Sequence, residues 1–474
     1  MNADRATSLR LAILAILLLS FIIRLAGLNA QSIWRDEADS LRFAGSPALL
    51  TQMLTEPGHN GPLYYVLLRG WLGLVGPGLT AARLFSALWG TLTVALVYAV
   101  GRRLFTVSVA ALAALLAGVS PYLVWYSQEA RMYAPALAVG LLALRLLLAA
   151  LKRGGAGRWL IYVLSAGLSL YLHLAAALLI PVHILAGLLT RRRLIYLAAL
   201  GLLLTAGPLL SWIIPFLLHP IVIGRAPARP ADMFAGLLLA LTAGPSGLFS
   251  LWTALPGLFL ALAGAALAPA GERRSVGLAL AWLLLPLAGL ALLALRLPVF
   301  SERYLIFVAP AFCLLAARGV AALRARWRAL AGLTLTATLV VCGAGLWAQL
   351  TQPIKPDFRS AVALYRAERQ PGDIVLFLIP QAQGPFEELA PADGARYLAA
   401  PYAGRPAEAA TVPAQLEALL ADSRRVWLIE SEVETWDPDG ICRRWLEQRY
   451  DIARRAELHL LRVTMYTRRV IGRL

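Results

Sequence analysis

Apolar runs of roughly 18–22 residues recur from Leu9 to Leu350, separated by short segments rich in arginine. A run of about 20 apolar residues can cross the hydrocarbon core of a bilayer as a helix. The pattern therefore predicts a polytopic α-helical membrane protein. Eleven spans are expected, over residues 9–29, 81–101, 106–126, 131–151, 158–174, 175–190, 194–216, 251–270, 276–296, 304–320 and 329–349.

Two further apolar stretches are too short or too interrupted to be counted as spans. Residues 63–72 contain Arg69, and we expect them to form an interfacial helix in a first external loop, residues 30–80. Residues 233–249 are broken by Gly244-Pro245, which favours a re-entrant or interfacial segment. If that segment crossed the membrane fully, the orientation of everything after it would reverse.

Basic clusters give the spans a direction. They fall between alternate spans, and the positive-inside rule places them on the cytoplasmic side together with the N-terminus. We interpret the first span as a retained signal anchor. An odd number of spans then places residues 350–474 outside the cytoplasm. The clusters are Arg102-Arg103, Lys152-Arg153 with Arg158, Arg191–Arg193, Arg273-Arg274 and the arginines of 318–328.

The pattern changes after the last span, near Gln352-Pro353. Helical stretches are expected at 357–369, 412–422 and 438–449, and strands at 374–379, 426–429 and 457–467. Repeated helix–strand units predict a small α/β domain with a mostly parallel sheet. The chain therefore divides into a transmembrane domain, 1–350, and an extracytoplasmic domain, 351–474.

Composition agrees with a membrane protein, since 59% of the residues are hydrophobic, 15% are charged and the mean hydropathy is +0.69. Residues 351–474 contain 17 basic and 17 acidic residues, so the net charge of +18 lies in the membrane part. We attribute it to topology and to an anionic lipid substrate rather than to nucleic acid. The three cysteines form no disulfide framework or metal cluster by spacing.

Acidic residues are rare in residues 1–350, yet Asp36, Glu37 and Asp39 stand together directly after the first span. Carboxylates at a membrane boundary are costly to desolvate, which favours a functional interpretation. The alternative is a solvated turn with a helix N-cap. The predicted topology places this cluster at the external face.

Four constellations share that predicted face. They supply carboxylates, aromatic rings suited to sugars, and arginine forks suited to phosphate. They are Trp34-Arg35-Asp36-Glu37, His59-Asn60-Gly61-Pro62-Leu63-Tyr64-Tyr65, Ser120-Pro121-Tyr122-Leu123-Val124-Trp125-Tyr126-Ser127-Gln128-Glu129-Ala130-Arg131-Met132-Tyr133 and Ser301-Glu302-Arg303-Tyr304, and His173 ends a span nearby.

Simpler roles exist for several of these residues. Arg131 could snorkel at a span end, His59 could be a solvated loop residue, and His173 could be a polar anchor. The aromatic residues of 122–126 could belong to the interfacial aromatic belt.

Taken in order, these motifs resemble the C-type (GT-C) glycosyltransferase superfamily, in the branch of protein mannosyltransferases and aminoarabinose transferases. The resemblance covers roughly residues 9–350. It implies a transferase that uses a polyprenyl-phosphate monosaccharide, with Asp36 as the catalytic base and Glu37 as its neighbour. It departs from the aminoarabinose branch at His59-Asn60, where that branch has an acid and a lysine, so the resemblance carries over neither a lysine contact to phosphate nor a metal held by that acid.

The expected reaction joins an acceptor hydroxyl to the sugar and releases the lipid phosphate. Asp36 would accept the proton, and Arg131 or Arg303 would stabilise the departing phosphate. No cofactor is required by the pattern, although a divalent metal is possible. The substrate-binding residues expected are Asp39, His59, Asn60, Tyr64, Tyr126, Gln128, Glu129, Arg131, Tyr133, His173, Glu302, Arg303 and Tyr304.

The expected partners are a polyprenyl-phosphate-linked sugar and a lipid, glycan or protein acceptor at a bacterial-type cytoplasmic membrane. A transporter or flippase of lipid-linked glycans is the main alternative. Transporters usually carry polar residues at mid-membrane, whereas here the polar motifs gather at one edge. A membrane anchor without catalysis would not require the acidic cluster.

Overall fold

A computed structural model of the chain describes all residues except 1–2, 56–60, 191–193, 219–228, 296–299, 391–393 and 470–474. Its contacts divide the chain into two compact units. The helical unit comprises Met1–Leu28 and, apart from the undescribed gap at 219–228, Phe43–Thr351. The sheet unit comprises Gln352–Leu474 together with Asn29–Arg42, the segment that carries the acidic cluster.

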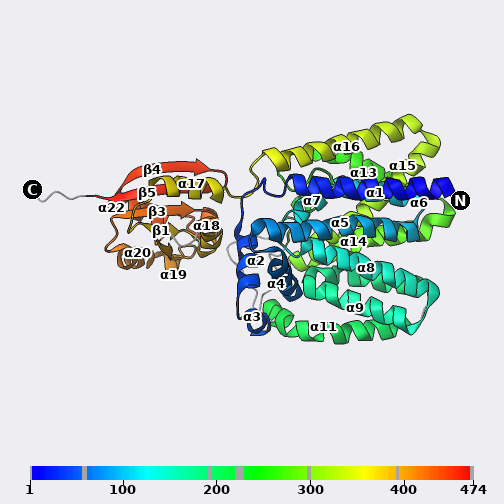
Figure 1. Cartoon of the computed structure of the whole chain (residues 1–474), viewed down its shortest axis with the longest axis horizontal. Coiled ribbons are helices and arrows are strands. Elements are labelled where there is room, and N and C mark those ends of the chain that lie inside the picture. The colour runs from blue at the N-terminus through cyan, green and yellow to red at the C-terminus, as the bar shows by residue number, and fades with distance from the viewer. Residues whose placement is uncertain are drawn as a thin grey trace, which may run out of the picture. The chain divides into compact units, whose positions relative to one another are not determined.

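The helical unit is a bundle of long apolar helices (Figure 1). Six described helices are long and apolar enough to cross a membrane, or seven if the bent pair α6–α7 is one span. Every predicted span overlaps a helix, but only these six or seven pass by length and composition among the described residues, so the number eleven is not confirmed. The main helices are α1 (Ala3–Ala26), α4 (Pro62–Val75), α5 (Leu79–Leu104), α6 (Val107–Val119), α7 (Pro121–Ser127), α8 (Tyr133–Arg153), α9 (Ala156–Leu172), α10 (Ile180–Thr190), α11 (Leu194–Leu218), α12 (Pro230–Ala243), α13 (Leu255–Ala266), α14 (Arg273–Ala294), α15 (Ala309–Arg326) and α16 (Arg328–Thr351).

Shorter helices connect or precede these elements. α2 (Arg35–Gly45) begins in the sheet unit and continues into the helical unit, where α3 (Leu49–Thr55) follows. Four 3-10 turns introduce later helices, namely η1 (Leu174–Leu179), η2 (Leu251–Ala254), η3 (Ala270–Glu272) and η4 (Glu302–Val308).

The span predicted at 106–126 is broken rather than straight. α6 and α7 meet at 58° because Ser120 ends the first helix and Pro121 begins the second. Proline lacks a backbone N–H and fits best in the first turn of a helix. The Ser120 hydroxyl accepts from the Leu123 amide, and the Gln349 amide of α16 donates to the Pro121 carbonyl at 2.9 Å. Because of the break, the motif from Tyr126 to Tyr133 begins at the end of a short helix that is tilted relative to α6.

Arg24 explains why the first apolar run contains a charge. Its guanidinium is fully buried and donates to Ser20 in its own helix, to the Gly118 carbonyl at 3.1 Å and to the Ser127 hydroxyl at 3.2 Å. Arg24 therefore ties α1 to the broken pair α6–α7.

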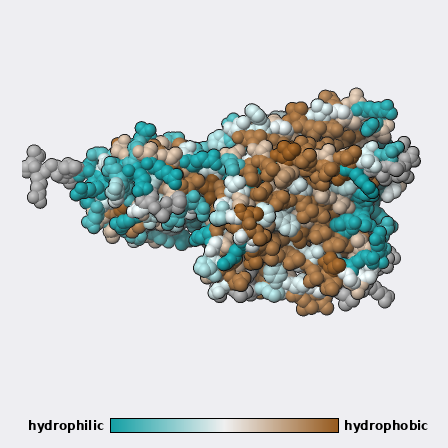
Figure 2. Space-filling view, in the orientation of Figure 1, coloured by the Kyte–Doolittle hydropathy of each residue, from teal (hydrophilic) through white to brown (hydrophobic). Residues whose placement is uncertain are grey.

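The face of the helical unit seen in Figure 2 is largely hydrophobic. Exposed side chains such as Leu14, Leu18, Ile22 and Leu203 cover helices that a soluble protein would bury. This surface agrees with a multi-pass membrane protein.

The two stretches that we excluded as spans form short helices. α4 begins at Pro62, and both α4 and α12 have 14 residues, or about 21 Å, which is less than the hydrocarbon thickness. α4 packs against α5 and α9, and α12 packs against α7 and α16.

The sheet unit has five strands in the order β2-β1-β3-β5-β4. β1 (Ile374–Phe377) pairs in parallel with β2 (Arg396–Ala399) and with β3 (Arg425–Glu430), whereas β5 (Leu461–Arg468) runs antiparallel to β3 and β4 (Tyr450–Leu458). The expectation of a mostly parallel sheet was wrong, because the sheet is mixed.

The error has a local cause. The range predicted as one strand, 457–467, covers the end of β4, a turn at Leu460, whose φ is 54°, and most of β5. β4 is polar and mostly exposed, so it lacks the alternation that reveals a half-buried strand. β2 has only four residues at the sheet edge.

Helices cover both faces of this sheet. α17 (Phe358–Glu368) and α18 (Gln383–Leu389) pack on the face of Val375, Phe377 and Trp427. α20 (Val412–Leu420) and α22 (Ile441–Arg449) pack on the opposite face, and short helices η5 (Pro380–Ala382), α19 (Pro406–Ala409) and α21 (Val433–Trp436) complete the connections. The result is a three-layer α/β/α fold.

Candidate functional site

The segment that carries the acidic cluster is held by the first residues of the sheet unit's C-terminal part. The Gln31 side chain donates to the Gln352 carbonyl at 2.8 Å and accepts from the Ile354 amide at 2.9 Å. Arg359 donates from its guanidinium to the Asn29 carbonyl at 3.1 Å. These bonds fix the backbone that leads into α2.

Glu37 is fully buried and paired with Lys355. The ammonium nitrogen lies 3.1 Å from Oε2 of Glu37, and it also lies 5.4 Å from the ring centre of Trp34. Sequence reasoning missed Lys355, because nothing in the local pattern of residues 351–357 links it to a residue 318 positions earlier.

Asp36 lies in the first turn of α2, where the helix dipole favours an anionic side chain. Its carboxylate is 14% exposed and lies 3.7 Å from Nε of Arg35, which also pairs with Glu432 at 3.2 Å. Asp39 is more exposed and pairs with Arg42 at 2.9 Å. Within the cluster, Glu37 is enclosed while Asp36 keeps contact with solvent.

In the helical unit, the other motifs meet around a series of aromatic rings. Tyr122, Tyr126, Tyr133, His173 and Tyr304 follow one another with centroid separations of 5.2, 5.1, 5.3 and 5.6 Å. The rings come from α7, α8, the residue after α9, and η4, so four segments far apart in sequence meet here.

Two hydrogen bonds orient the last of these segments. The Tyr122 hydroxyl donates to the Glu302 carbonyl at 2.5 Å, and the Trp282 indole donates to the Phe307 carbonyl at 2.8 Å. Tyr122 belongs to the third predicted constellation, although it was not among the expected binding residues, and Trp282 was not predicted. Both residues position η4, which begins at Glu302.

Charged groups surround the rings. The Arg131 guanidinium donates to the Tyr65 hydroxyl at 3.4 Å, and the Arg303 guanidinium lies 5.4 Å from the ring centre of Tyr304. Both arginines are close enough to interact electrostatically with His173, as are Glu129 and Glu302 with Tyr126. Two cations and two carboxylates therefore converge on one aromatic wall.

The start of α4 joins the same cluster through Gly61, whose φ is +84°. A Cβ at this position would lie 2.4 Å from the Leu172 carbonyl, so the close approach requires glycine. Tyr64 is fully buried against Tyr65 and Phe85. His59 and Asn60 lie outside the described residues.

His173 and Gln128 have specific structural contacts. Nδ1 of His173 accepts from the Ala175 amide at 2.9 Å, so a neutral ring carries its proton on Nε2. The Gln128 side chain donates to the Arg24 carbonyl at 3.0 Å and thus caps the end of α1. His173 belongs to the ring series, whereas Gln128 supports the helix behind it.

The structure thus groups Glu129, Arg131, Tyr126, Tyr133, His173, Glu302, Arg303 and Tyr304 in the helical unit, and Asp36, Glu37 and Asp39 in the sheet unit. Among the described residues, no three His, Cys, Asp or Glu side chains are arranged to hold a metal ion.

Known structures share this architecture over nearly the whole chain. ArnT from Cupriavidus metallidurans bound to undecaprenyl phosphate superposes with a TM-score of 0.63 at 15% identity, covering 96% of this chain and 97% of that one. The oligosaccharyltransferase of Archaeoglobus fulgidus, tethered with an acceptor peptide, gives 0.56 at 12% identity over 96% and 74%. Arabinofuranosyltransferase AftD from Mycobacteria gives 0.52 at 15% identity over 97% and 41%.

These similarities define the class: the chain has the fold of the C-type membrane glycosyltransferases, as its motifs indicated. More particularly, residues 59–212 match the family model described as dolichyl-phosphate-mannose-protein mannosyltransferase. None of the curated protein sequences compared matches this chain.

Proposed function

We propose that this protein transfers a monosaccharide from a polyprenyl-phosphate donor to an acceptor hydroxyl on the extracytoplasmic side of the membrane. The observation that carries the proposal is the similarity in fold, over 96% of the chain, to an ArnT that binds undecaprenyl phosphate. The converging arginines and aromatic rings of the helical unit supply groups suited to a phosphate and a sugar.

Asp36 is the general base of this mechanism. The acceptor oxygen forms a bond to C1 of the sugar while its proton passes to the Asp36 carboxylate. The bond from C1 to the phosphate oxygen breaks, and the electron pair leaves with the polyprenyl phosphate. Such a direct displacement inverts the anomeric centre. The accessible position of Asp36 beside the enclosed Glu37 supports this choice between the two acids.

Arg131 and Arg303 stabilise the phosphate, whose charge increases as the bond to C1 breaks. A phosphate is a good leaving group, so no general acid is needed. Glu37 then has a positioning role, since its pair with Lys355 holds the first turn of α2.

The test uses purified full-length protein with radiolabelled undecaprenyl-phosphate sugars and measures donor consumption. Asp36→Asn should reduce turnover by at least about 10²-fold, the scale of general-base catalysis. Asp422→Asn, an exposed aspartate elsewhere in the sheet unit, is the matched control. Donor movement across a vesicle membrane without consumption would instead support a transporter, and near-normal turnover in Asp36→Asn would remove this residue as the base.

A further inference from the structure

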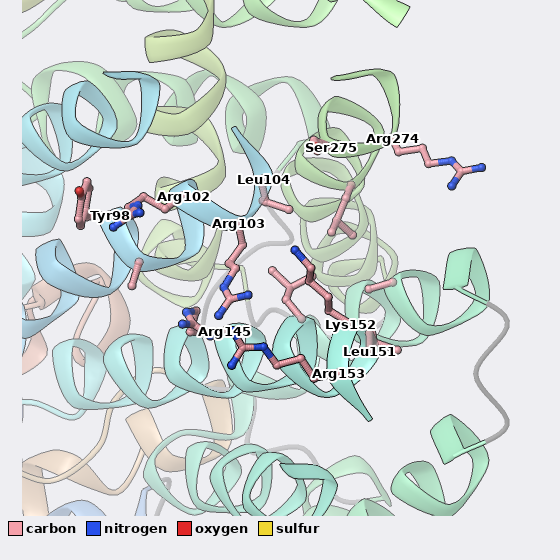
Figure 3. A pocket seen from close by; sticks show the side chains of 14 residues that line it. Tyr98, Arg102, Arg103, Leu104, Arg145, Leu151, Lys152, Arg153, Arg274 and Ser275 are labelled. Atoms are coloured by element: carbon pink, nitrogen blue, oxygen red, sulfur yellow. The ribbon is translucent and has the colours of Figure 1, made fainter. Parts of the chain in front are cut away.

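One cavity of the helical unit, distant in sequence from the motifs above, is lined by cations. It has a volume of about 810 Å³ and lies between the C-terminal ends of α5 and α8 and the start of α14 (Figure 3). Its charged lining residues are Arg102, Arg103, Arg145, Lys152, Arg153 and Arg274. Three of the basic clusters that we predicted on one side of the membrane therefore meet at one cavity.

Three guanidinium groups point toward one another in this cavity. Figure 3 shows Arg103 of α5 and Arg145 and Arg153 of α8 with their ends converging, whereas Arg274 extends away. Arg145 interacts electrostatically with both of the others. Within the described chain, no carboxylate pairs with any of the three, although Arg318 at another place in the bundle pairs with Glu272 at 2.6 Å.

The segregation of positive charge to one membrane face does not explain Arg145. It lies eight residues before the end of α8, or about 12 Å along the helix axis, and is half-buried. Like charges that converge in a partly buried space repel one another unless an anion lies between them. Arginine forks match the oxygen atoms of a phosphate.

Apart from Tyr98 and Ser275, the remaining lining is apolar, which indicates an amphipathic ligand. Leu104, Leu148, Leu151 and Leu278 line the same cavity. A neighbouring groove of about 490 Å³ shares Tyr98 and Arg102 with it and continues along Ile13, Leu14 and Leu17 of α1. Arg102 lies 5.7 Å from the ring centre of Tyr98, at the boundary between the two spaces.

We propose that this cavity binds the phosphate of an anionic phospholipid from the adjacent leaflet, with Arg103, Arg145 and Arg153 as the phosphate ligands and the groove beside α1 as the site of an acyl chain. A headgroup of this kind fits the volume, the charge and the apolar border together.

The experiment is native mass spectrometry of the full chain in detergent, titrated with phosphatidylglycerol or phosphatidylcholine. Wild-type protein should bind phosphatidylglycerol more tightly than phosphatidylcholine. The triple variant R103Q/R145Q/R153Q should bind phosphatidylglycerol more weakly than wild type, by a factor on the order of ten or more. The matched control R324Q/R326Q/R328Q removes three exposed arginines outside the cavity and should keep the wild-type affinity.

Three outcomes would overturn the proposal. They are unchanged phosphatidylglycerol affinity in the triple variant, an equal loss in the control, and displacement of the lipid by inorganic phosphate at equal concentration. The last would assign the cavity to a soluble anion. If the triple variant does not fold, Arg153→Gln at the exposed end of α8 must weaken phosphatidylglycerol binding severalfold, and no weakening overturns the proposal.

Discussion

Lys355 and Glu37 form a buried ion pair, with 3.1 Å between the ammonium nitrogen and the carboxylate oxygen. Their side chains are 5% and 0% exposed, and Lys355 also faces the ring of Trp34. The pair joins the segment that carries the acidic cluster to the first residues after the last helix of the bundle. The accessible Asp36 therefore stands next to a residue whose position the sheet unit determines.

Breaking that pair should destabilise the sheet unit. Lys355→Met leaves the Glu37 charge buried without its cation, at a cost of about 3–5 kcal/mol. We expect a lower melting temperature for the full chain in detergent, measured by the change in intrinsic tryptophan fluorescence on heating. The double variant Glu37→Leu/Lys355→Met should recover most of the loss, because no isolated charge remains. Arg405→Met, in the exposed Arg405–Glu408 pair, is the control and should change little.

The arginines beside the aromatic rings should control donor binding. Arg131→Ala and Arg303→Ala test which arginine contacts the phosphate. The variant that removes this contact should weaken binding of undecaprenyl phosphate by about 1.5–3 kcal/mol, as for a charged hydrogen bond. Tyr65→Phe removes one partner of Arg131 and should have a smaller effect. Arg158→Ala, on an exposed position at the start of α9, should bind normally. Equal lipid affinity in both arginine variants would exclude these residues as ligands.

Glu430 predicts a pH dependence of stability in the sheet unit. Burial raises the pKa of this carboxyl above its usual value of 4.5, despite Arg443 at 2.9 Å and Arg462. The folded protein then binds this proton more tightly than the unfolded chain does, so the stabilisation is fully present below pH 4.5 and is lost as pH rises through the raised value.

Glu430→Gln imitates the protonated form and isolates this effect. The melting temperature of the variant minus that of the wild type should increase as pH rises from acidic to neutral values. A decrease in this difference over the same pH range would mean that Arg443 and Arg462 lower the pKa of Glu430 by more than burial raises it.

The native cysteines should be inert to thiol reagents. Cys313, Cys342 and Cys442 are all buried, and burial together with Asp437 raises the pKa of the Cys442 thiol. The wild-type chain should therefore give no signal with an impermeant maleimide. Asp439→Cys, on an exposed turn before α22, should be labelled on intact cells if the sheet unit is extracytoplasmic. Labelling of Asp439→Cys only after membrane disruption would contradict that orientation.

The sequence predicted the positions of the long helices well, because their apolar runs are unambiguous. It predicted β1 and β3 for the same reason, since both are continuous buried strands. It missed β2 and β4, which are short or polar and take their conformation from neighbouring strands. The break at Ser120-Pro121 was visible as a Ser-Pro pair, but the bend depends on the packing of α16.

For the candidate site, the sequence indicated the motifs but not the residues that contact them in the fold. The run from Tyr126 to Tyr133 is prominent in the sequence, whereas its ring contacts with His173 and Tyr304 arise only in the folded bundle. Lys355 and Trp282 stand in segments with no local signal of function. Long-range partners of this kind depend on tertiary packing, which a single sequence does not reveal.

The location of Asn29–Arg42 in the sheet unit has a consequence for biosynthesis. This segment leaves the ribosome early, but the residues that hold it, from Gln352 to Arg359, are made more than 300 residues later. During translation at roughly 5–20 residues per second, the helices can insert while the stretch around Asp36 still lacks its final contacts. Completion of the last quarter of the chain then sets the geometry of its first loop, so chains truncated before Gln352 should reach the membrane without ordering that loop.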